Sequence, residues 1–156
     1  MAMPQVGTLA PDFTLPSDTG DTIRLSALRG GPVVLYFYPR DDTSGCTAEA
    51  CGIRDDYGAY QRAGVTVLGV SPDSVASHIR FKEKYQLPFP LLADEDHSVH
   101  EAYGVWGMRK ARMGVLRTTF LIASDGKIAH VFENVKPQGH STEILAALKG
   151  VRPLAD

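Results

Sequence analysis

The chain has little excess charge and no long hydrophobic run. Its 156 residues include 16 lysines and arginines and 18 aspartates and glutamates, which gives a formal net charge of -2. Binding to nucleic acid or to an anionic membrane through bulk charge favours a strong basic excess, so neither partner is expected. The most apolar stretch, Val33 to Tyr38, is far too short to span a bilayer.

Cysteine is scarce, since Cys46 and Cys51 are the only two. The opening residues show neither the positive nor the apolar segment of a secretory signal, so a cytoplasmic location is expected. In a reducing compartment, two cysteines are more often reactive than structural. A chain of this length buries enough core to fold without a disulfide or a metal. We therefore expect a single domain over residues 1–156.

The pattern of apolar residues predicts an α/β fold. Short β-branched and aromatic runs alternate with segments that carry apolar residues at helical spacing. Strands are predicted at 13–15, 23–25, 32–38, 65–70, 89–92, 118–122 and 127–132. Helices are predicted at 46–63, 74–85, 100–103 and 141–148, with one helical turn at 26–31. This order fits a thioredoxin-like fold with an N-terminal β-hairpin and a mixed central sheet flanked by helices, although periodicity alone leaves other α/β layouts open.

Cys46 follows the predicted loop 39–45, between a buried strand and the next helix. Ligands bind at the carboxyl ends of strands in open α/β sheets. A helix start adds unpaired N–H groups and the positive end of the dipole, which stabilise a thiolate. A cysteine of ordinary pKa, about 8.5, is ~3% thiolate at pH 7, so full ionisation gains only roughly 30-fold. Enzymes need gains of about 10⁶ or more, so donors must also stabilise the charge that develops on the substrate.

Three other interpretations of the cysteines are weaker. An inert small hydrophobe does not suit the polar setting of Cys46. A zinc site needs three or four ligands, and no Cys-x-x-Cys pair or nearby histidine supplies them. A static disulfide is awkward, because residues five apart on one α-helix have Cα atoms roughly 8 to 9 Å apart. Disulfides seldom span more than about 7 Å, so Cys46 and Cys51 can bridge only if the helical turn between them unwinds.

Several segments resemble one known family. Residues 37–51 read FYPRDDTSGCTAEAC, in which Pro39, Thr43 and Cys46 form a Pro-x-x-x-Thr-x-x-Cys pattern. Residues 7–13 read GTLAPDF, residues 114–122 read GVLRTTFLI and residues 135–140 read VKPQGH. Together these segments resemble the peroxiredoxins, and most closely the bacterioferritin-comigratory, or Q-type, class with two cysteines. The resemblance covers nearly the whole chain. Two departures are Ser44, where many members have proline, and a short stretch between Trp106 and Arg117 that bears on substrate access.

The resemblance implies a role for each matched residue. The Cys46 thiolate would attack the peroxide and become a sulfenic acid, and Cys51 would condense with it to an intramolecular disulfide. Thr43 would hold the peroxide and the thiolate, Pro39 would fix and shield the loop, and Arg117 would supply a permanent positive charge. Without the resemblance, Thr43 would be interpreted as a helix N-cap or a loop hydroxyl, Pro39 as a strand terminator and Arg117 as a surface residue.

Further consequences of the resemblance concern partners. The substrates would be hydrogen peroxide and organic hydroperoxides, and thioredoxin or a similar dithiol protein would reduce the disulfide. No cofactor is implied. A monomer is expected, with a dimer as the alternative. Glu49, assigned to the first turn of the Cys46 helix, would orient an arginine such as Arg117, or would only favour the helix dipole.

Other polar clusters carry weaker signals. His97 and His100 share a helical spacing but have no third ligand, so both are expected to face solvent. Arg109, Lys110 and Arg112 form a basic cluster, interpreted as a surface loop, with docking of the reductant protein as the alternative.

Two competing functions remain at this point. A thiol-disulfide oxidoreductase on the same fold is disfavoured, because such enzymes use Cys-x-x-Cys. A redox-sensing or chaperone-like interaction protein, with incidental turnover, is the third hypothesis.

Overall fold

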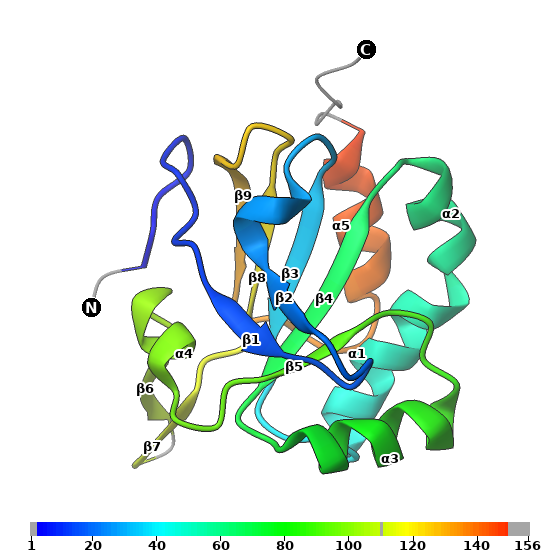
Figure 1. Cartoon of the computed structure of the whole chain (residues 1–156), viewed down its shortest axis with the longest axis vertical. Coiled ribbons are helices and arrows are strands. Elements are labelled where there is room, and N and C mark those ends of the chain that lie inside the picture. The colour runs from blue at the N-terminus through cyan, green and yellow to red at the C-terminus, as the bar shows by residue number, and fades with distance from the viewer. Residues whose placement is uncertain (1–2, 110, 150–156) are drawn as a thin grey trace.

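The computed structural model describes residues 3–109 and 111–149 (Figure 1). Its strands are β1 (Thr14–Pro16), β2 (Thr22–Arg24), β3 (Val33–Phe37), β4 (Thr66–Ser71), β5 (Leu91–Ala93), β6 (Trp106–Arg109), β7 (Arg112–Val115), β8 (Thr118–Ile122) and β9 (Ile128–Glu133). Its helices are α1 (Ser44–Asp55), α2 (Tyr57–Arg62), α3 (Val75–Tyr85), α4 (Ser98–Ala102) and α5 (His140–Leu148), with a 3-10 turn at Leu25–Leu28. Within this part of the chain, none of the helices has both the length and the apolar character needed to cross a bilayer.

The central sheet is mixed, with the strand order β5-β4-β3-β8-β9. Strand β3 runs parallel to β4 and antiparallel to β8, and β1 pairs with β2 as a separate antiparallel hairpin. The predicted thioredoxin-like arrangement with an N-terminal hairpin is confirmed. Because β3 and β8 are antiparallel, with Phe37 opposite Thr118, the loop after β3 and Arg117 lie at the same end of the sheet.

The two faces of the sheet are covered differently. Alternate residues of β3 enter two separate cores: Leu35 and Phe37 on one face, Val34 and Tyr36 on the other. The first core also takes in the N-terminal hairpin and α4, and the second takes in α1, α2, α3 and α5. Figure 1 shows the hairpin and α5 on opposite sides of the sheet. The helix that carries Cys46 is therefore anchored to the core on its inner side.

The helix predicted at 46–63 is wrong at its start and in its continuity. It begins at Ser44, with Thr43 as an extended N-cap residue. The prediction missed this start because serine and glycine, the first two residues of the helix, are poor helix formers. It is also divided in two at Asp56, which has φ -98° and ψ 9°. The Asp56 carboxylate accepts a hydrogen bond from Ser141 Oγ of α5 at 2.7 Å, a distant contact that periodicity does not reveal.

The segment interpreted as a basic surface loop is instead an antiparallel hairpin formed by β6 and β7. Met108 lies directly opposite Met113, and both are exposed. Arg112 is exposed as well, while Lys110 lies outside the described residues. The hairpin precedes Arg117 and so borders the end of the sheet where the predicted site residues gather.

Candidate active site

Cys46 lies in the first turn of α1, and its residue is 1% exposed. The first intrahelical bond runs from the Thr47 N–H to the Thr43 carbonyl at 2.8 Å, so the N–H groups before Thr47 have no partner within the helix. These groups and the positive end of the helix dipole favour negative charge at the position of the sulfur.

Arg117 connects Cys46 to a buried carboxylate. Its Nη2 donates to Cys46 Sγ at 3.0 Å, and its Nη1 donates to Glu49 Oε1 at 3.0 Å. The Arg117 side chain is only 10% exposed, so its charge acts where water screens it weakly. The guanidinium thus stabilises a thiolate directly.

Glu49 is buried beneath this contact, and its side chain is 1% exposed. Burial raises the pKa of Glu49 to about 7, although the charge of Arg117 opposes the shift. Helix α1 starts two residues earlier than predicted and has no acidic residue in its first turn, so the placement of Glu49 in the first turn is wrong. Its contact with Arg117 favours the interpretation in which Glu49 orients that arginine.

His140 completes the buried side of the site, and the sequence assigned it no role. Its Nε2 lies 2.8 Å from Thr119 Oγ1 and 4.0 Å from Glu49 Oε2. Burial lowers the pKa of His140, although Glu143 opposes the shift, so the ring is neutral near pH 7. His140 ends the VKPQGH segment, which was noted for its family resemblance. Its proximity to Glu49 could not be predicted, because it depends on packing between α5 and α1.

Gly45 is held against Arg117. A Cβ at this position would lie 2.8 Å from Arg117 Nη2 and 3.3 Å from Pro137 Cγ, closer than a side chain tolerates without displacing its neighbours. The absence of a side chain at residue 45 therefore leaves the space that the Arg117 guanidinium occupies.

Thr43 and Pro39 lie on the loop that leads into α1, as predicted. The Thr43 hydroxyl donates to the Arg40 carbonyl at 3.0 Å, and its side chain makes no N-cap hydrogen bond to α1. Pro39 follows the end of β3 and is half-buried. The loop thus brings both residues to the start of the Cys46 helix, with the Thr43 hydroxyl exposed to solvent.

Cys51 lies on the same helix as Cys46, and both are free thiols. It is half-buried, and burial raises its pKa, with Asp55 adding to the shift and Arg54 opposing it. The five-residue spacing along an intact helix holds the two sulfurs apart. Any bond between them requires part of α1 to unwind.

Two cavities lie near the site, one lined by Arg117 and the other by Gly45, which packs against Arg117. One has a volume of about 290 Å³ and is lined by Met108, Leu116, Arg117, Asn134 and Val135. The other has a volume of about 250 Å³ and is lined by Ser44, Gly45, Ala48, Lys136, Pro137 and Gln138. The first combines the apolar side chains of Met108, Leu116 and Val135 with the polar ones of Arg117 and Asn134.

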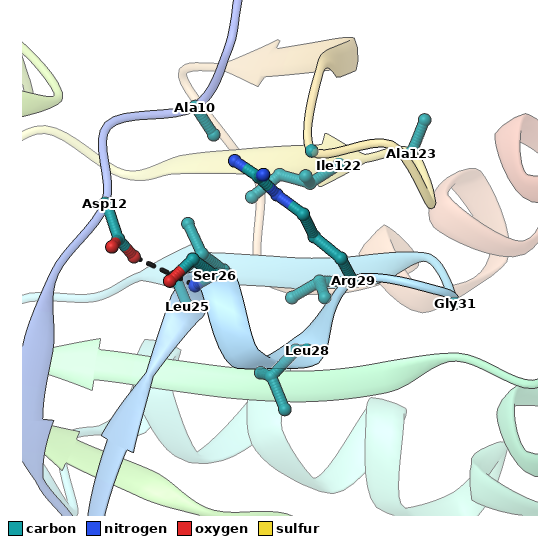
Figure 2. A pocket seen from close by; sticks show the side chains of 11 residues that line it. Ala10, Asp12, Leu25, Ser26, Leu28, Arg29, Gly31, Ile122 and Ala123 are labelled. Carbon is teal, nitrogen blue, oxygen red and sulfur yellow. Dashed lines mark hydrogen bonds between the residues drawn. The ribbon is translucent and has the colours of Figure 1, made fainter.

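A separate pocket lies beside the 3-10 turn (Figure 2). There the Ser26 N–H donates to Asp12 Oδ1 at 2.8 Å, and the Arg29 side chain extends toward Ala10. The pocket measures about 20 Å³, which is space for roughly one water molecule. None of the predicted site residues lines it, so it is not part of the cysteine site.

The expectation that His97 and His100 face solvent is wrong for His100. His100 is fully buried, and its Nδ1 lies 2.6 Å from Asp94 Oδ2. His97 is half-buried and stacks on Trp106 with 3.7 Å between ring centroids. His100 belongs to α4 and His97 is its N-cap residue. Both rings pack against Trp106 of β6, a contact that the sequence alone did not reveal.

A guanidinium at the sulfur suits a reaction in which negative charge passes from a thiolate to oxygen, which is the chemistry of a thiol peroxidase. Comparison with known proteins agrees with this class. Residues 6–131 match the model of the AhpC/TSA family. The Peroxiredoxin Bcp proteins of Bacillus subtilis and Escherichia coli are 44% and 46% identical to the chain over 149 residues. The matches cover 93% of this chain and 95% and 96% of the two relatives.

Solved structures give the same result. Xanthomonas campestris Peroxiredoxin Q superposes with a TM-score of 0.88 at 35% identity, covering 96% of this chain and 97% of that chain. A Xylella fastidiosa PrxQ mutant gives a TM-score of 0.91 at 31% identity, covering 96% and 98%. The chain belongs to the AhpC/TSA family, and within it to the Bcp, or Q-type, peroxiredoxins, which are thiol-dependent peroxidases.

Proposed function

We propose that Cys46 is the cysteine that reacts with the peroxide. The observation that carries this assignment is the 3.0 Å contact from Arg117 Nη2 to the Cys46 sulfur. In the first step, the thiolate attacks the terminal peroxide oxygen and the O–O bond breaks. The leaving oxygen takes up a proton and departs as water or an alcohol, while Cys46 is oxidised to a sulfenic acid.

Arg117, Thr43 and Pro39 assist this step. Arg117 stabilises the thiolate and then the charge that moves onto the peroxide oxygens. Rotation of the exposed Thr43 hydroxyl away from the Arg40 carbonyl would let it hold the peroxide. Pro39 stiffens the loop and limits the approach of water. Glu49 holds the second arm of the guanidinium and so fixes its direction.

Cys51 resolves the sulfenic acid. Its sulfur attacks the Cys46 sulfur, a disulfide forms and water leaves, so the two electrons taken by the peroxide are balanced by the two thiols. Because both cysteines lie within α1, the helical turn between them must unwind before this bond forms. Unwinding also exposes Cys51 to water, which removes the burial that raises its pKa.

A dithiol protein of the thioredoxin type is proposed to reduce the disulfide by exchange. The half-buried position of Cys51 in the folded helix would become accessible once α1 unwinds. A single domain, a monomeric state and a cytoplasmic location remain predictions from the sequence.

Hydrogen peroxide and organic hydroperoxides are the proposed substrates. The cavity beside Arg117 supports the second class, because Met108, Leu116 and Val135 present apolar surface to an alkyl chain. A similar Xanthomonas campestris protein, with 34% identity and a TM-score of 0.88, has been studied for alkyl peroxide reduction.

Steady-state peroxide consumption with a thioredoxin system tests the assignment. The Cys46→Ser variant is expected to lose activity completely. The Cys51→Ser variant is expected to form one sulfenic acid on Cys46 but to turn over poorly with thioredoxin. Full activity of Cys46→Ser would overturn the proposal, and normal cycling of Cys51→Ser would remove Cys51 from the resolving role.

A further inference from the structure

The loop between β3 and α1 is fastened to α3 by a buried ion pair. Asp41 Oδ2 lies 2.7 Å from His78 Nδ1, and the two side chains are 4% and 0% exposed. The same carboxylate accepts hydrogen bonds from the Tyr38 hydroxyl at 2.6 Å and from Ser77 Oγ at 2.8 Å. The backbone N–H of Asp41 donates to Asp73 at 2.8 Å. Asp41 is thus held by the residue that follows β3, by α3 and by the turn that precedes α3.

The contacts of the His78 ring fix its orientation. His78 Nε2 is 2.8 Å from the Leu92 carbonyl, which only accepts, so Nε2 carries a hydrogen. Nδ1 faces the Asp41 carboxyl group, which also accepts from Tyr38 and Ser77. Burial lowers the pKa of His78, but the hydrogen bond and charge of Asp41, the Leu92 carbonyl and the charge of Asp73 outweigh it, so the pKa is raised above its ordinary value.

The surroundings of the pair contain charges of both signs. A cavity of about 390 Å³ borders it and is lined by Arg40, Asp41, Asp42, Asp73, Ser77, Arg80, Phe81 and Lys84. The cations Arg40, Arg80 and Lys84 are exposed, so water screens them from His78. Asp41, Asp73 and His78 have ligand atoms within 4.8 Å of one another. The hydrogen bonds among them account for this grouping without a cation.

The next loop residue is held by the same helix. Asp42 adopts a left-handed backbone with φ 59°, and its carboxylate accepts from Lys84 Nζ and the Tyr85 hydroxyl, each at 2.8 Å. Side chains of α3 therefore bond to both Asp41 and Asp42, the two residues just before Thr43. These outer contacts are solvent-exposed and weaker than the buried pair.

We propose that the Asp41–His78 pair is a positioning device that sets the place of the peroxide-binding loop relative to the Cys46 sulfur. The proposal rests on the function proposed above for Cys46. Asp41 stands two residues before Thr43 and five before Cys46, so movement of Asp41 moves the hydroxyl that would hold the peroxide. A displacement of about 1 Å at a reacting group can cost on the order of 10²-fold in rate.

The test compares His78→Gln with Lys82→Gln. Lys82 lies on the same helix and pairs with the buried side chain of Asp18 at 2.6 Å. The bonds that hold Asp41 come from other residues, so the control removes an ion pair of α3 without releasing Asp41. The measurement is the single-turnover rate of Cys46 oxidation by hydrogen peroxide. At pH 7, His78→Gln is expected to lose roughly 10- to 100-fold, and Lys82→Gln less than about 3-fold. Equal losses in the two variants would show a merely structural role and overturn the proposal.

The pH profile gives a second readout. A raised pKa means that His78 is charged at low pH and that the ion pair is lost as pH rises through that pKa. The rate of Cys46 oxidation in the wild type is therefore expected to decline as the pH rises through the pKa of His78. Nuclear magnetic resonance of the His78 ring measures that pKa independently. The His78→Gln variant is expected to lack this decline. A wild-type rate without a decline at that midpoint contradicts the proposal.

Hydrogen exchange separates this proposal from the proposed function. If wild-type Cys46 does not react with peroxide, the proposed function is wrong. The hydrogen-exchange rate of the Asp41 amide then shows separately whether the ion pair holds the loop in place. That amide is expected to exchange faster in His78→Gln and normally in Lys82→Gln; no change in either overturns the proposal. Should His78→Gln not fold, Ser77→Ala removes one donor to the same carboxylate oxygen, and faster exchange of the Asp41 amide is again required.

Discussion

Arg117 reaches the Cys46 sulfur only because the residue before the cysteine is glycine. A Cβ on residue 45 would lie 2.8 Å from Arg117 Nη2, and the end of the arginine side chain would move away from the sulfur. We expect Gly45→Ala to lower the rate of Cys46 oxidation by roughly 10- to 100-fold. The fold should be preserved, since alanine suits a helix better than glycine. Gly58→Ala in α2 is the control.

Stopped-flow measurement of peroxide reduction checks this prediction, with circular dichroism to confirm folding. A Gly45→Ala rate equal to that of Gly58→Ala would mean that the contact between Arg117 and the sulfur does not limit the reaction. Arg117→Ala should exceed the roughly 30-fold loss that thiolate fraction alone explains.

Glu49 makes the stability of the protein depend on pH. Its pKa is raised from 4.5 to about 7 by burial, against the opposing charge of Arg117, so the folded protein holds a proton that the unfolded chain releases in this range. The free energy of unfolding should therefore fall by at most about 3 kcal/mol as the pH rises from 4.5 to about 7, and should then level off. Urea unfolding of wild type and Glu49→Gln at pH 5 and pH 8 measures the difference. Parallel profiles for the two proteins would refute the account of Glu49.

The sequence predicted single site residues better than their contacts. Cys46, Cys51 and Arg117 were singled out from local patterns and a family resemblance. The pairs Glu49 with Arg117 and Asp41 with His78 join residues that are far apart in the chain. Such pairs depend on strand register and helix packing, so spacing along the chain carries no signal for them.

Helix α1 must be stable enough to seat Cys46 and weak enough to unwind. Gly52 follows Cys51 inside this helix, and a Cβ there would meet only Ser141 Cβ at 3.9 Å, an ordinary contact. Gly52→Ala should therefore stabilise α1 by about 1 kcal/mol. If disulfide formation requires unwinding, that step should slow by roughly 5-fold, while sulfenic acid formation keeps its rate.

Rapid quenching and mass spectrometry follow the two steps separately. Gly58→Ala is again the matched control, because its Cβ would lie near only Arg62 Nη1 at 3.3 Å, outside the helix that carries the cysteines. Disulfide formation at the wild-type rate in Gly52→Ala would contradict the unwinding step.

Elements with strong local signals followed from the sequence, and features that depend on unusual turns or distant contacts did not. The buried strand β3 and the helix α3 with its Ser74 N-cap have strong local signals. The β6–β7 hairpin was missed because its turn contains Ala111 at φ 68°, where glycine or asparagine is the usual indication. The break at Asp56 was missed because Ser141 in α5 supplies its partner.

The oxidised molecule should be less stable than the reduced one. A disulfide that closes so short a ring contributes only about 2 kcal/mol through the unfolded state. Unwinding α1 exposes Ala50 and Ile53, both fully buried in the reduced form, and removes the contact between Glu49 and Arg117. We expect the melting temperature to fall by several degrees on oxidation. Calorimetry of both forms checks this, and a higher melting temperature for the disulfide form would show that α1 stays largely packed.

The arrangement of the whole molecule explains how distant segments form one site. The antiparallel pairing of β3 with β8 brings Arg117 to the loop after Phe37, and α5 closes the buried side through His140. The alternation of strands and helices indicated this class of fold, but left the strand order open until the resemblance to a known family was considered.

The central claim is that Cys46, held by Arg117, is oxidised first. The most direct test treats the Cys51→Ser variant with one equivalent of hydrogen peroxide, traps sulfenic acid chemically and locates the label by peptide mass spectrometry. A near-stoichiometric label on Cys46 is expected, formed much more slowly when Arg117 is also replaced by alanine. Peroxide consumed by this variant while Cys46 remains an unmodified thiol would contradict the claim.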